Sequence, residues 1–455
     1  MDIYNVRDSR KLLVSVYNAQ EAREAIAGGG RIIDSEDPKT ALGNISPLNI
    51  MAVSDAVLDS KRNLDVQLST NIGEDQLLFR RTDDGRAIEK SKSEIAGKAA
   101  QAAIGVAVAM GRQVHPTTIV KVGLDGMGTD ELGAVLSEIV TTLGRTQSLQ
   151  NTRVMAVLFA QDVATWDERK NQDWVRKGLV ASREYVPCAA GTPGAIDLLD
   201  FAVNKEDPTA RATMQTLARD GYLVGDSTSS TVMLNGLFKQ TDFFTGIAQG
   251  GKTGRAMIKA MVDAAAKAGA HGLMIDTSIL SKCSGICCVD TSGSDEMVDV
   301  NALVTFPDGK PLQGILSLDD IRFFVDYCHF KGIVANLAGS ISSLQAQQLW
   351  LLVPGLNQLS TRGSSSANVS DPSLKEQTSG GGSRATNTIV QALVRGLAPP
   401  EQGGVLNVPA SLMNNPAARP VLDKLKCRLD ELREARALPK LEAFWVDDAG
   451  VPRPF

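Results

Sequence analysis

The chain has 455 residues, of which 43% are hydrophobic and 22% are charged, and its formal net charge is −5. These values are ordinary for a soluble globular protein, and the acidic balance argues against a nucleic-acid binder that works through bulk positive charge. No apolar run reaches the roughly 18 residues that a membrane helix needs, and the polar N-terminus lacks a signal sequence, so we expect a cytoplasmic protein without a membrane partner.

Strand and helix patterns alternate along the chain. We expect strands at 12–16, 31–34, 64–70, 118–124, 153–160, 272–275, 333–338 and 358–361. We expect helices at 19–27, 47–59, 93–111, 129–143, 254–268, 318–330, 344–350 and 386–396, and a charged helix at 420–435. Asn18 is suited to cap the first helix, and Pro47 suits the first turn of the second, where its missing N–H costs nothing.

Eight strand–helix units in alternation predict a parallel sheet, and eight is the number that closes a (β/α)8 TIM barrel. The alternative is an open doubly wound sheet. That fold carries a Gly-x-Gly-x-x-Gly fingerprint after its first strand, where this chain has Tyr17-Asn18-Ala19-Gln20. The fold class we expect is therefore α/β, a TIM barrel.

A segment of roughly ninety residues separates the fifth strand from the next helix, far longer than an ordinary connection. We expect it to cover the active face as a lid, a subunit contact or a second binding site. A hairpin is expected from 302–306 and 312–316, and the polar stretch 73–92 is expected to be a loop. The domain division is a first barrel part at 1–162, an inserted subdomain at 163–250, a second barrel part at 251–397 and a C-terminal extension at 398–455.

Charged residues occupy the strands or their carboxyl ends, where this fold places its chemistry. Asp34 ends the second strand, Lys121 stands in the middle of the fourth and Asp276 follows the sixth. A buried lysine needs carboxylates, which raise its pKa while burial lowers it, and this opposition can tune the lysine for proton transfer. A helix cap at Asp34 and a solely structural ion pair at Lys121 are the alternatives.

Two glycine-containing turns follow the last two strands, at the usual phosphate site of such barrels. The residues are Gly339-Ser340 and Arg362-Gly363, with Arg384 as a further candidate. Glycine lets backbone N–H groups approach an anion, and arginine binds it bidentately. The alternative is that these are simply tight turns.

The remaining polar candidates predict no metal site. Cys283, Cys287 and Cys288 lack the spacing of a zinc pair and have no histidine near them in sequence, so we expect free loop thiols. We expect Met155 and Met274, which lie on strands, to belong to the core. The histidines at 115, 271 and 329 form no recognisable triad.

Six short motifs resemble those of one family and occur in the same order: Lys11–Val16, Glu21–Asp34, Val120–Leu124, Met274–Thr277, Leu337–Ile341 and Thr361–Gly363. The family is (5-formylfuran-3-yl)methyl phosphate synthase, and the resemblance covers 1–160 and 250–397. It implies a β/α barrel that condenses two molecules of glyceraldehyde 3-phosphate through a lysine Schiff base, with loss of phosphate and water. Lys121 matches the family's proton-transferring lysine, and Asp34 and Asp276 match its active-site aspartates.

Two lysines of the family are replaced in this chain. Glu36 stands where the family has its Schiff-base lysine, and Leu280 stands where it has a second lysine. A carboxylate cannot form an imine with an aldehyde. Either Lys39 or Lys282 reaches in as a substitute, or the chain runs different chemistry.

We therefore expect a lyase or aldolase-type enzyme acting on a small phosphorylated carbonyl substrate, as a homo-oligomer, with no cofactor and no nucleic-acid partner. The catalytic group is predicted to be Lys121, with Asp34, Glu36 and Asp276 around it. One of these carboxyls is expected to stay protonated and act as an acid, and a divalent cation held by the cluster ranks below this proton-transfer hypothesis. The alternative function is a catalytically inactive barrel that serves as a binding or assembly subunit.

Overall fold

The computed structural model describes residues 10–36, 45–61, 65–73, 79–81, 87–89, 91–111, 117–123, 129–160, 254–277, 286–291, 294–301, 303, 312–361, 366–368, 383–385, 389–391, 393–394, 404–446 and 452–454. The predicted insertion at 163–250 lies outside these residues. None of the described helices is both long and apolar enough to cross a membrane.

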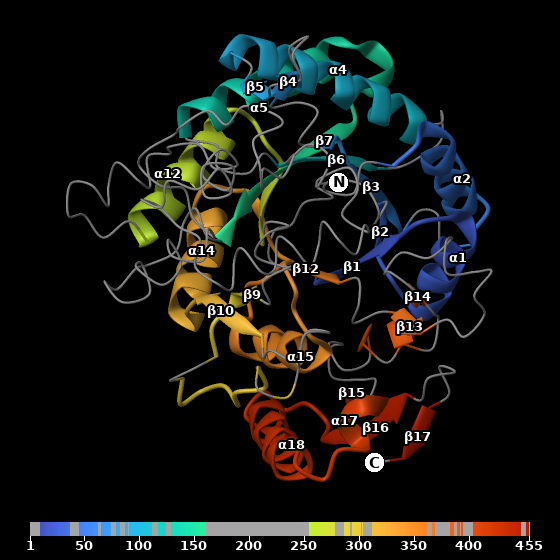
Figure 1. Cartoon of the computed structure of the whole chain (residues 1–455), viewed down its shortest axis with the longest axis vertical. Helices are drawn as coiled ribbons and strands as arrows, with labels where there is room; N and C mark the ends of the chain where they lie inside the picture. The colour runs from blue at the N-terminus through green and yellow to red at the C-terminus, as the bar shows by residue number, and fades with distance from the viewer. Residues whose placement is uncertain are drawn as a thin grey trace, which may run out of the picture.

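Eight parallel strands close into a barrel in the order β1-β12-β11-β8-β7-β6-β3-β2, and the helices surround it (Figure 1). The strands are β1 Lys11–Val16, β2 Ile32–Ser35, β3 Gln67–Asn71, β6 Thr118–Gly123, β7 Thr152–Phe159, β8 Gly272–Asp276, β11 Val334–Leu337 and β12 Gln358–Thr361. The predicted (β/α)8 barrel is thereby confirmed, and the open sheet is excluded because the ring closes between β12 and β1.

The helices of the outer layer are α1 Ala19–Gly28, α2 Pro47–Leu58, α4 Lys92–Met110, α5 Thr129–Arg145, α12 Gly254–Lys267, α14 Leu318–Phe330 and α15 Ser343–Leu352. Their ends follow from local sequence. The Asn18 side chain accepts hydrogen bonds from two backbone N–H groups at the start of α1, and Gly29 ends that helix with a left-handed φ of 104°. Ser46 caps α2, and Pro47 occupies its first turn.

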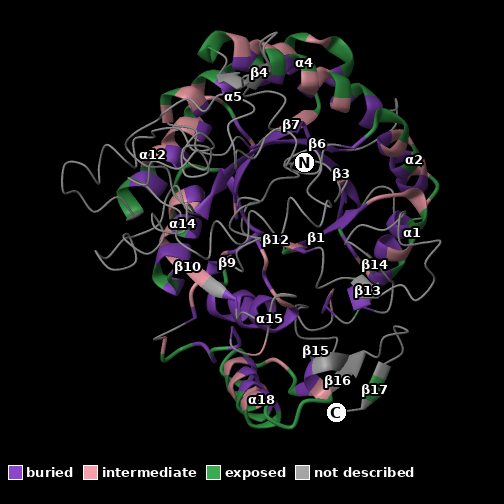
Figure 2. Ribbon diagram, in the orientation of Figure 1, coloured by how far each residue is buried: buried purple, intermediate pink, exposed green. Residues whose placement is uncertain are grey.

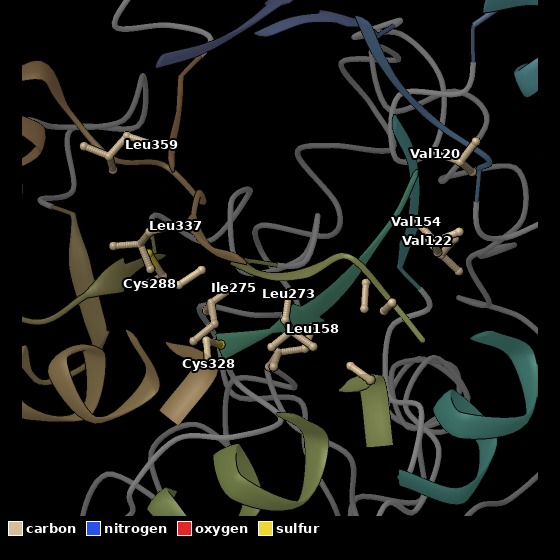
Figure 3. Close-up of a cluster of buried hydrophobic side chains, with 14 of the residues drawn as sticks. Val120, Val122, Val154, Leu158, Leu273, Ile275, Cys288, Cys328, Leu337 and Leu359 are labelled. Atoms are coloured by element: carbon tan, nitrogen blue, oxygen red, sulfur yellow. The ribbon is translucent and has the colours of Figure 1, made fainter. Parts of the chain in front are cut away.

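The strands bury side chains on both faces, as strands of a parallel barrel do. Alternate residues pack outward against the helices, as Val120, Val154 and Leu273 do (Figure 3). The other residues fill the barrel interior, where an apolar cluster comprises Leu13, Ile32, Ile119, Met155, Val157, Phe159, Met274, Val334 and Ala338. The prediction that Met155 and Met274 are core residues is confirmed.

Helix α15 is buried along its whole length (Figure 2). One side faces the barrel, and the other faces a C-terminal unit built from β15 Gly404–Pro409, α17 Ala410–Met413, α18 Arg419–Glu434, β16 Leu441–Val446 and β17 Pro452–Pro454. Leu344 and Leu351 of α15 share an apolar cluster with Leu422, Leu425 and Leu429 of α18. The sequence predicted α18 but not the three-stranded sheet beside it.

Three short pairings differ from the sequence prediction or lie outside it. β4 Phe79–Arg81 and β5 Ala87–Glu89 form an antiparallel pair within the stretch that was expected to be a loop. β10 Gln313–Leu316 pairs in parallel with β9 Ile286–Val289, which was not expected, and most of the other arm of the expected hairpin, 302–306, lies outside the described residues. β13 Ser366–Asn368 pairs with β14 Ser383–Ala385.

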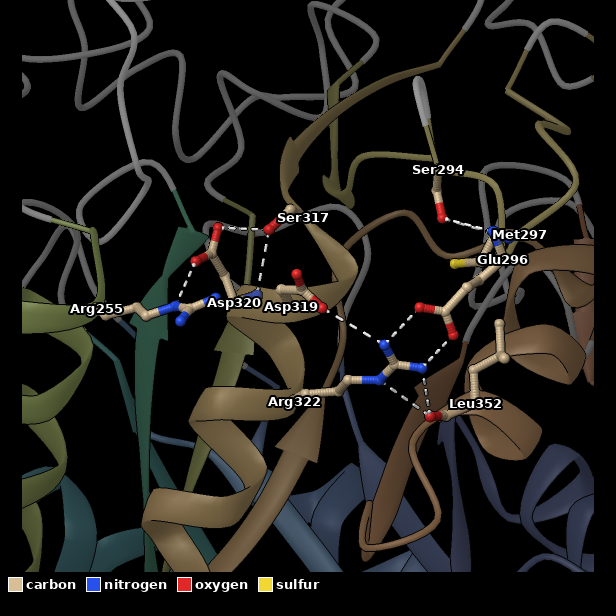
Figure 4. Close-up of polar contacts among 9 residues, drawn as sticks. All are labelled: Arg255, Ser294, Glu296, Met297, Ser317, Asp319, Asp320, Arg322 and Leu352. Carbon is tan, nitrogen blue, oxygen red and sulfur yellow. Dashed lines mark hydrogen bonds and ion pairs between the residues drawn. The ribbon is translucent and has the colours of Figure 1, made fainter.

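Arg322 on α14 ties the segment after β9 to the end of α15 (Figure 4). Its guanidinium donates to both carboxylate oxygens of Glu296, at 2.8 and 2.6 Å, and to the backbone oxygen of Leu352 at 3.3 Å. The bidentate geometry fixes the orientation of both partners. The segment 294–301 is thereby held over the outer surface of the second half of the barrel.

Candidate active site

The buried charges of the barrel lie toward the carboxyl ends of the strands. Asp34 is the third residue of the four-residue strand β2, and Lys121 is the fourth residue of the six-residue strand β6. Strand β3 lies between these two strands. Because alternate residues share a face, Asp34 and Lys121 point into the barrel with Ile32 and Ile119 of the interior cluster.

Lys121 and Asp34 form an ion pair inside the barrel. Lys121 Nζ donates to Asp34 Oδ2 at 2.6 Å, and Ser15 Oγ donates to the same oxygen at 3.3 Å. Asp34 has no exposed surface and Lys121 is 6% exposed. The carboxylate is therefore inaccessible from solvent, and only the lysine retains a small accessible surface.

Charges around the pair shift both pKa values upward. Burial lowers the pKa of Lys121, but the carboxylates of Asp34, Glu36 and Asp276 outweigh it and hold the pKa above its ordinary value. Burial raises the pKa of Asp34, and Glu36 raises it further, against the effect of Lys121. Within the described part of the chain, the cluster contains one ammonium group and three carboxyl groups, so it favours bound protons. The resting form of Lys121 is therefore the ammonium ion.

Glu36 and Asp276 lie at the rim of this cluster. Glu36 directly follows β2, and Asp276 is the last residue of β8. Both are partly exposed, and both act electrostatically on Lys121. Asp276 Oδ1 also accepts a hydrogen bond from the backbone N–H of Thr277 at 2.7 Å, which orients the carboxylate. The structure thus brings together the four residues that the sequence proposed as a catalytic group.

The Gly339-Ser340 turn packs directly against Asp276. Both residues have positive φ, 91° for Gly339 and 55° for Ser340. A Cβ atom on Gly339 would lie 2.6 Å from the backbone nitrogen of Thr277 and 2.9 Å from Asp276 Oδ1. Glycine is therefore required here for both its φ and its size. The sequence predicted a glycine turn for phosphate, and this contact with Asp276 was not expected.

Several predicted site residues lie outside the described part of the chain: Lys39, Lys282, Cys283, Arg362 and Gly363. The side chain of Arg384 on β14 is also not described. The substitute-lysine hypothesis and the arginine half of the phosphate site therefore remain predictions.

The two described cysteines of the second insertion are buried strand residues of β9 and not loop thiols as predicted. Cys288 Sγ donates to the backbone oxygen of Ala338 at 2.7 Å. Burial raises the pKa of Cys287 to about 11, so its thiol is held in the unreactive protonated form. Among the described residues, no cluster of histidine, cysteine or carboxylate side chains is arranged to hold a metal ion.

Sequence reasoning missed two serines that flank Asp34. Ser15 of β1 and Ser69 of β3 stand in register with Asp34 on either side of it. Ser15 Oγ donates to Asp34 Oδ2, and a hydrogen bond from the Ser69 side chain lowers the pKa of the Asp34 carboxyl group. Counting alternate residues from Leu13 and from Gln67 would have placed both serines on the interior face.

The first part of the chain, residues 12–177, matches the family model of 4-HFC-P synthase. No curated protein matches the chain.

Several solved structures are similar to the chain at low sequence identity. Phosphoribosyl anthranilate isomerase from Thermus thermophilus has 8% identity and a TM-score of 0.33, over 85% of this chain and 98% of that one. Thiamine phosphate pyrophosphorylase from Pyrococcus furiosus has 10% identity and a TM-score of 0.34, and the match covers 86% of this chain and 98% of that one. 2,3-Dimethylmalate lyase has 10% identity and a TM-score of 0.33, and the match covers 78% of this chain and 76% of that one. At these scores the likeness carries no argument about function. Over residues 12–177 the chain carries the sequence pattern of the furan phosphate synthase family, and the resemblance inferred from its motifs is confirmed there.

Proposed function

We propose that the chain is a lyase-type enzyme that acts on small phosphorylated carbonyl compounds, with Lys121 as its principal catalytic group. One observation carries the proposal: the buried ion pair between Lys121 Nζ and Asp34 Oδ2 within a cluster that contains two further carboxyl groups. Burying charge inside a barrel opposes folding unless the charge is closely paired. Such an arrangement at the carboxyl ends of barrel strands is typical of active sites.

The four residues have different accessibility, and this suggests different roles. Asp34 is fully buried, so it is a positioning residue that holds the Lys121 ammonium group. Glu36 and Asp276 are partly exposed and can contact a substrate. Lys121 contacts the buried carboxylate of Asp34, and the two accessible carboxylates also act on its charge.

The proposed first step is the removal of a proton from the carbon next to the substrate carbonyl. Glu36 or Asp276 accepts the proton, and the electron pair of the C–H bond forms an enediolate. The Lys121 ammonium group stabilises the developing oxyanion by donating a hydrogen bond or its proton. In a triose phosphate, the enediolate electrons then expel the phosphate group from the neighbouring carbon. In this scheme a carboxylate takes the proton, Lys121 stabilises the oxyanion, and the phosphate group leaves with the electron pair.

An imine at position 36 is chemically excluded, because Glu36 has no amine. Lys121 is held as an ammonium ion by its three carboxylate neighbours and is therefore a poor nucleophile at rest. The proposal accordingly assigns acid and electrostatic catalysis to Lys121. Covalent catalysis by Lys39 or Lys282 is the competing hypothesis for the same substrate class.

Phosphate release from glyceraldehyde 3-phosphate tests the proposal. The Lys121→Met substitution keeps the side-chain volume and removes the charge. We expect it to slow turnover by about 10²–10⁴-fold, the usual contribution of a positioned acid or base. Lys98→Met on the exposed surface of α4 is the matched control and should leave turnover unchanged. Circular dichroism of both variants separates lost catalysis from lost folding.

Borohydride treatment in the presence of the triose phosphate, followed by peptide mass spectrometry, distinguishes the mechanisms. No adduct is expected on Lys121. An adduct on Lys39 or Lys282 would replace acid catalysis by an imine mechanism. Full turnover in Lys121→Met would make the ion pair structural and end this proposal.

The second candidate function is a catalytically inactive barrel that binds or assembles with a partner. Glu36 in place of the family's imine-forming lysine is the observation that favours it. This candidate predicts no turnover of any phosphorylated aldehyde, together with unchanged ligand or partner binding when Lys121 is replaced by Met. Detectable phosphate release that depends on Lys121 would exclude it.

A further inference from the structure

Asn71, the last residue of β3, stands beside Lys121 on the interior face of the barrel. The two residues are paired in the register of β3 with β6. Because alternate residues share a face, Asn71 points into the barrel with Ser69, the neighbour of Asp34 in register. Adjacent strands are about 4.8 Å apart, so the side chains of Asn71 and Lys121 start close together. This asparagine is not among the site residues predicted from the sequence.

The side chain of Lys121 crosses the interior face of β3 next to Asn71. It begins level with Asn71, and its Nζ ends at Asp34 Oδ2, level with Ser69. Ser69 is one interior position before Asn71 along β3. Asn71 keeps 9% of its surface exposed and Lys121 keeps 6%, so both retain a small accessible area toward the carboxyl end of the barrel.

The Asn71 side chain is held with its amide donors unused. Gly73 N–H donates to Asn71 Oδ1 at 3.1 Å in the turn after β3, where Gly73 has a φ of 83°. A backbone N–H can only donate, so this contact identifies the amide oxygen and leaves Nδ2 on the other side of the group. Among the residues that the structure describes, none accepts a hydrogen bond from Nδ2. Polar groups that are this deeply buried ordinarily have partners, so the two N–H donors are available to a ligand oxygen.

We propose that Asn71 Nδ2 binds the second of two neighbouring oxygens of the substrate, while Lys121 binds the first. The inference rests on the proposed function, because that reaction forms an enediolate, in which two adjacent carbons each carry an oxygen. Lys121 is an ammonium ion and suits the oxygen on which negative charge develops. The neutral amide of Asn71 suits the hydroxyl oxygen beside it. The substrate class is thereby narrowed to α-hydroxy carbonyl compounds.

The hydrogen bond with Gly73 also gives Asn71 a structural role, and one substitution separates the two roles. Asn71→Ser keeps a side-chain oxygen that can accept from the N–H two residues on, but it removes the amide donors. Asn415→Ser is the matched control, because Asn415 Oδ1 accepts from Ala417 N–H at 3.0 Å in the same pattern. Asn415 is exposed and lies between α17 and α18. A solely structural asparagine would alter stability in these variants and leave ligand selectivity unchanged.

Calorimetry at neutral pH with two phosphorylated probes of equal charge tests the second oxygen. Phosphoglycolohydroxamate has a carbonyl oxygen and an adjacent hydroxyl oxygen, as an enediolate does, whereas phosphoglycolamide has the carbonyl oxygen alone. Neither probe is an aldehyde, so binding is measured without turnover. We expect wild type and Asn415→Ser to bind the hydroxamate about tenfold more tightly than the amide, the scale of one hydrogen bond. Asn71→Ser should bind the two probes equally, with the affinity that wild type has for the amide.

Two results would overturn the inference. The first is wild type that binds neither probe or binds both equally, since no second oxygen is then recognised. The second is a preference for the hydroxamate that persists in Asn71→Ser. If Asn71→Ser does not fold, Asn71→Thr repeats the test, because its hydroxyl accepts in the same turn and its branched side chain suits a strand. Failure of the proposed enzyme shows instead as full turnover in Lys121→Met, a measurement that uses neither probe.

Discussion

Lys121 Nζ lies 2.6 Å from Asp34 Oδ2 although β3 separates their two strands, so the pair is formed across the barrel interior. The two partners contribute unequally. Among the residues that the structure describes, Lys121 is the single ammonium group facing three carboxyl groups, whereas Asp34 is one of three carboxyl groups. Removing the positive charge therefore leaves buried negative charge without a partner, while removing one negative charge leaves the lysine with two others.

We predict a corresponding asymmetry in stability. Lys121→Met should lower the free energy of unfolding by about 3–5 kcal/mol, as expected when one partner of a buried ion pair is removed. Asp34→Asn should lower it by less than about 2 kcal/mol. Denaturant unfolding at neutral pH measures both, with Lys259→Met of the exposed Lys259–Asp263 pair as a control that should cost much less than Lys121→Met. If Lys121→Met and Asp34→Asn lowered the free energy of unfolding equally, the unequal roles assigned to the two charges would be contradicted.

His271 makes stability depend on pH. Burial lowers its pKa to about 4 in the folded chain, so between the ordinary value and about 4 the unfolded chain binds more protons. The contribution of neutral His271 to folding stability is therefore fully present when the pH is above the ordinary histidine pKa. It is lost as the pH falls from that value to about 4. We expect wild type to lose about 3 kcal/mol more than His271→Gln between pH 7 and pH 4. Urea unfolding measures the free energy of unfolding of the two proteins at each pH. If this free energy changes with pH in the same way in both, the pKa of His271 is not lowered in the folded chain.

Gly339→Ala should destabilise the fold and disturb the candidate site. The substitution forces a positive φ on alanine, at a cost of about 1–3 kcal/mol, and places a methyl group against Asp276 and Thr277. Gly332→Ala is a matched control, because Gly332 has a φ of 73° and nothing within 4 Å of the added Cβ. The excess cost of Gly339→Ala over Gly332→Ala measures the contact with Asp276. We expect this excess to be positive and only Gly339→Ala to reduce turnover.

Arg362→Ala should weaken the binding of a phosphorylated ligand. The prediction rests on the glycine turns after the last two strands and on the observed position of Gly339 beside Asp276. The expected loss is about 1.5–3 kcal/mol in binding free energy, the scale of a hydrogen bond to a charged group. Calorimetry with a triose phosphate measures it, and Arg145→Ala at the exposed end of α5 is the control. An unchanged affinity in Arg362→Ala would remove this residue from the site.

The barrel was predictable because its signals are local and repeated. Apolar strands followed by helices recur along the chain, and Asn18 and Pro47 act at helix starts as their residue types predict. The gathering of Asp34, Lys121 and Asp276 was also predictable, because all three lie on barrel strands toward their carboxyl ends, and their catalytic role stays a prediction.

What the sequence did not reveal depends on contacts between distant segments. The parallel pairing of β9 with β10 joins strands that are distant in sequence, whereas adjacency in sequence indicated only a hairpin between 302–306 and 312–316. The burial of Cys287 and Cys288 follows from that pairing and from the contact with Ala338. Likewise, nothing in the local pattern of β1 indicates that Lys11 would reach across β2 to Gln67.

Helix α15 has no solvent-facing side, because the barrel covers one face and α18 with its sheet covers the other. The covering residues lie between 404 and 446, near the end of the chain. During synthesis, α15 is therefore complete before its outer cover has left the ribosome, and Leu344 and Leu351 stay accessible to chaperones for that interval. A premature stop codon after α15 but before residue 404 would leave the same apolar surface permanently uncovered, so chains truncated in this interval are expected to aggregate.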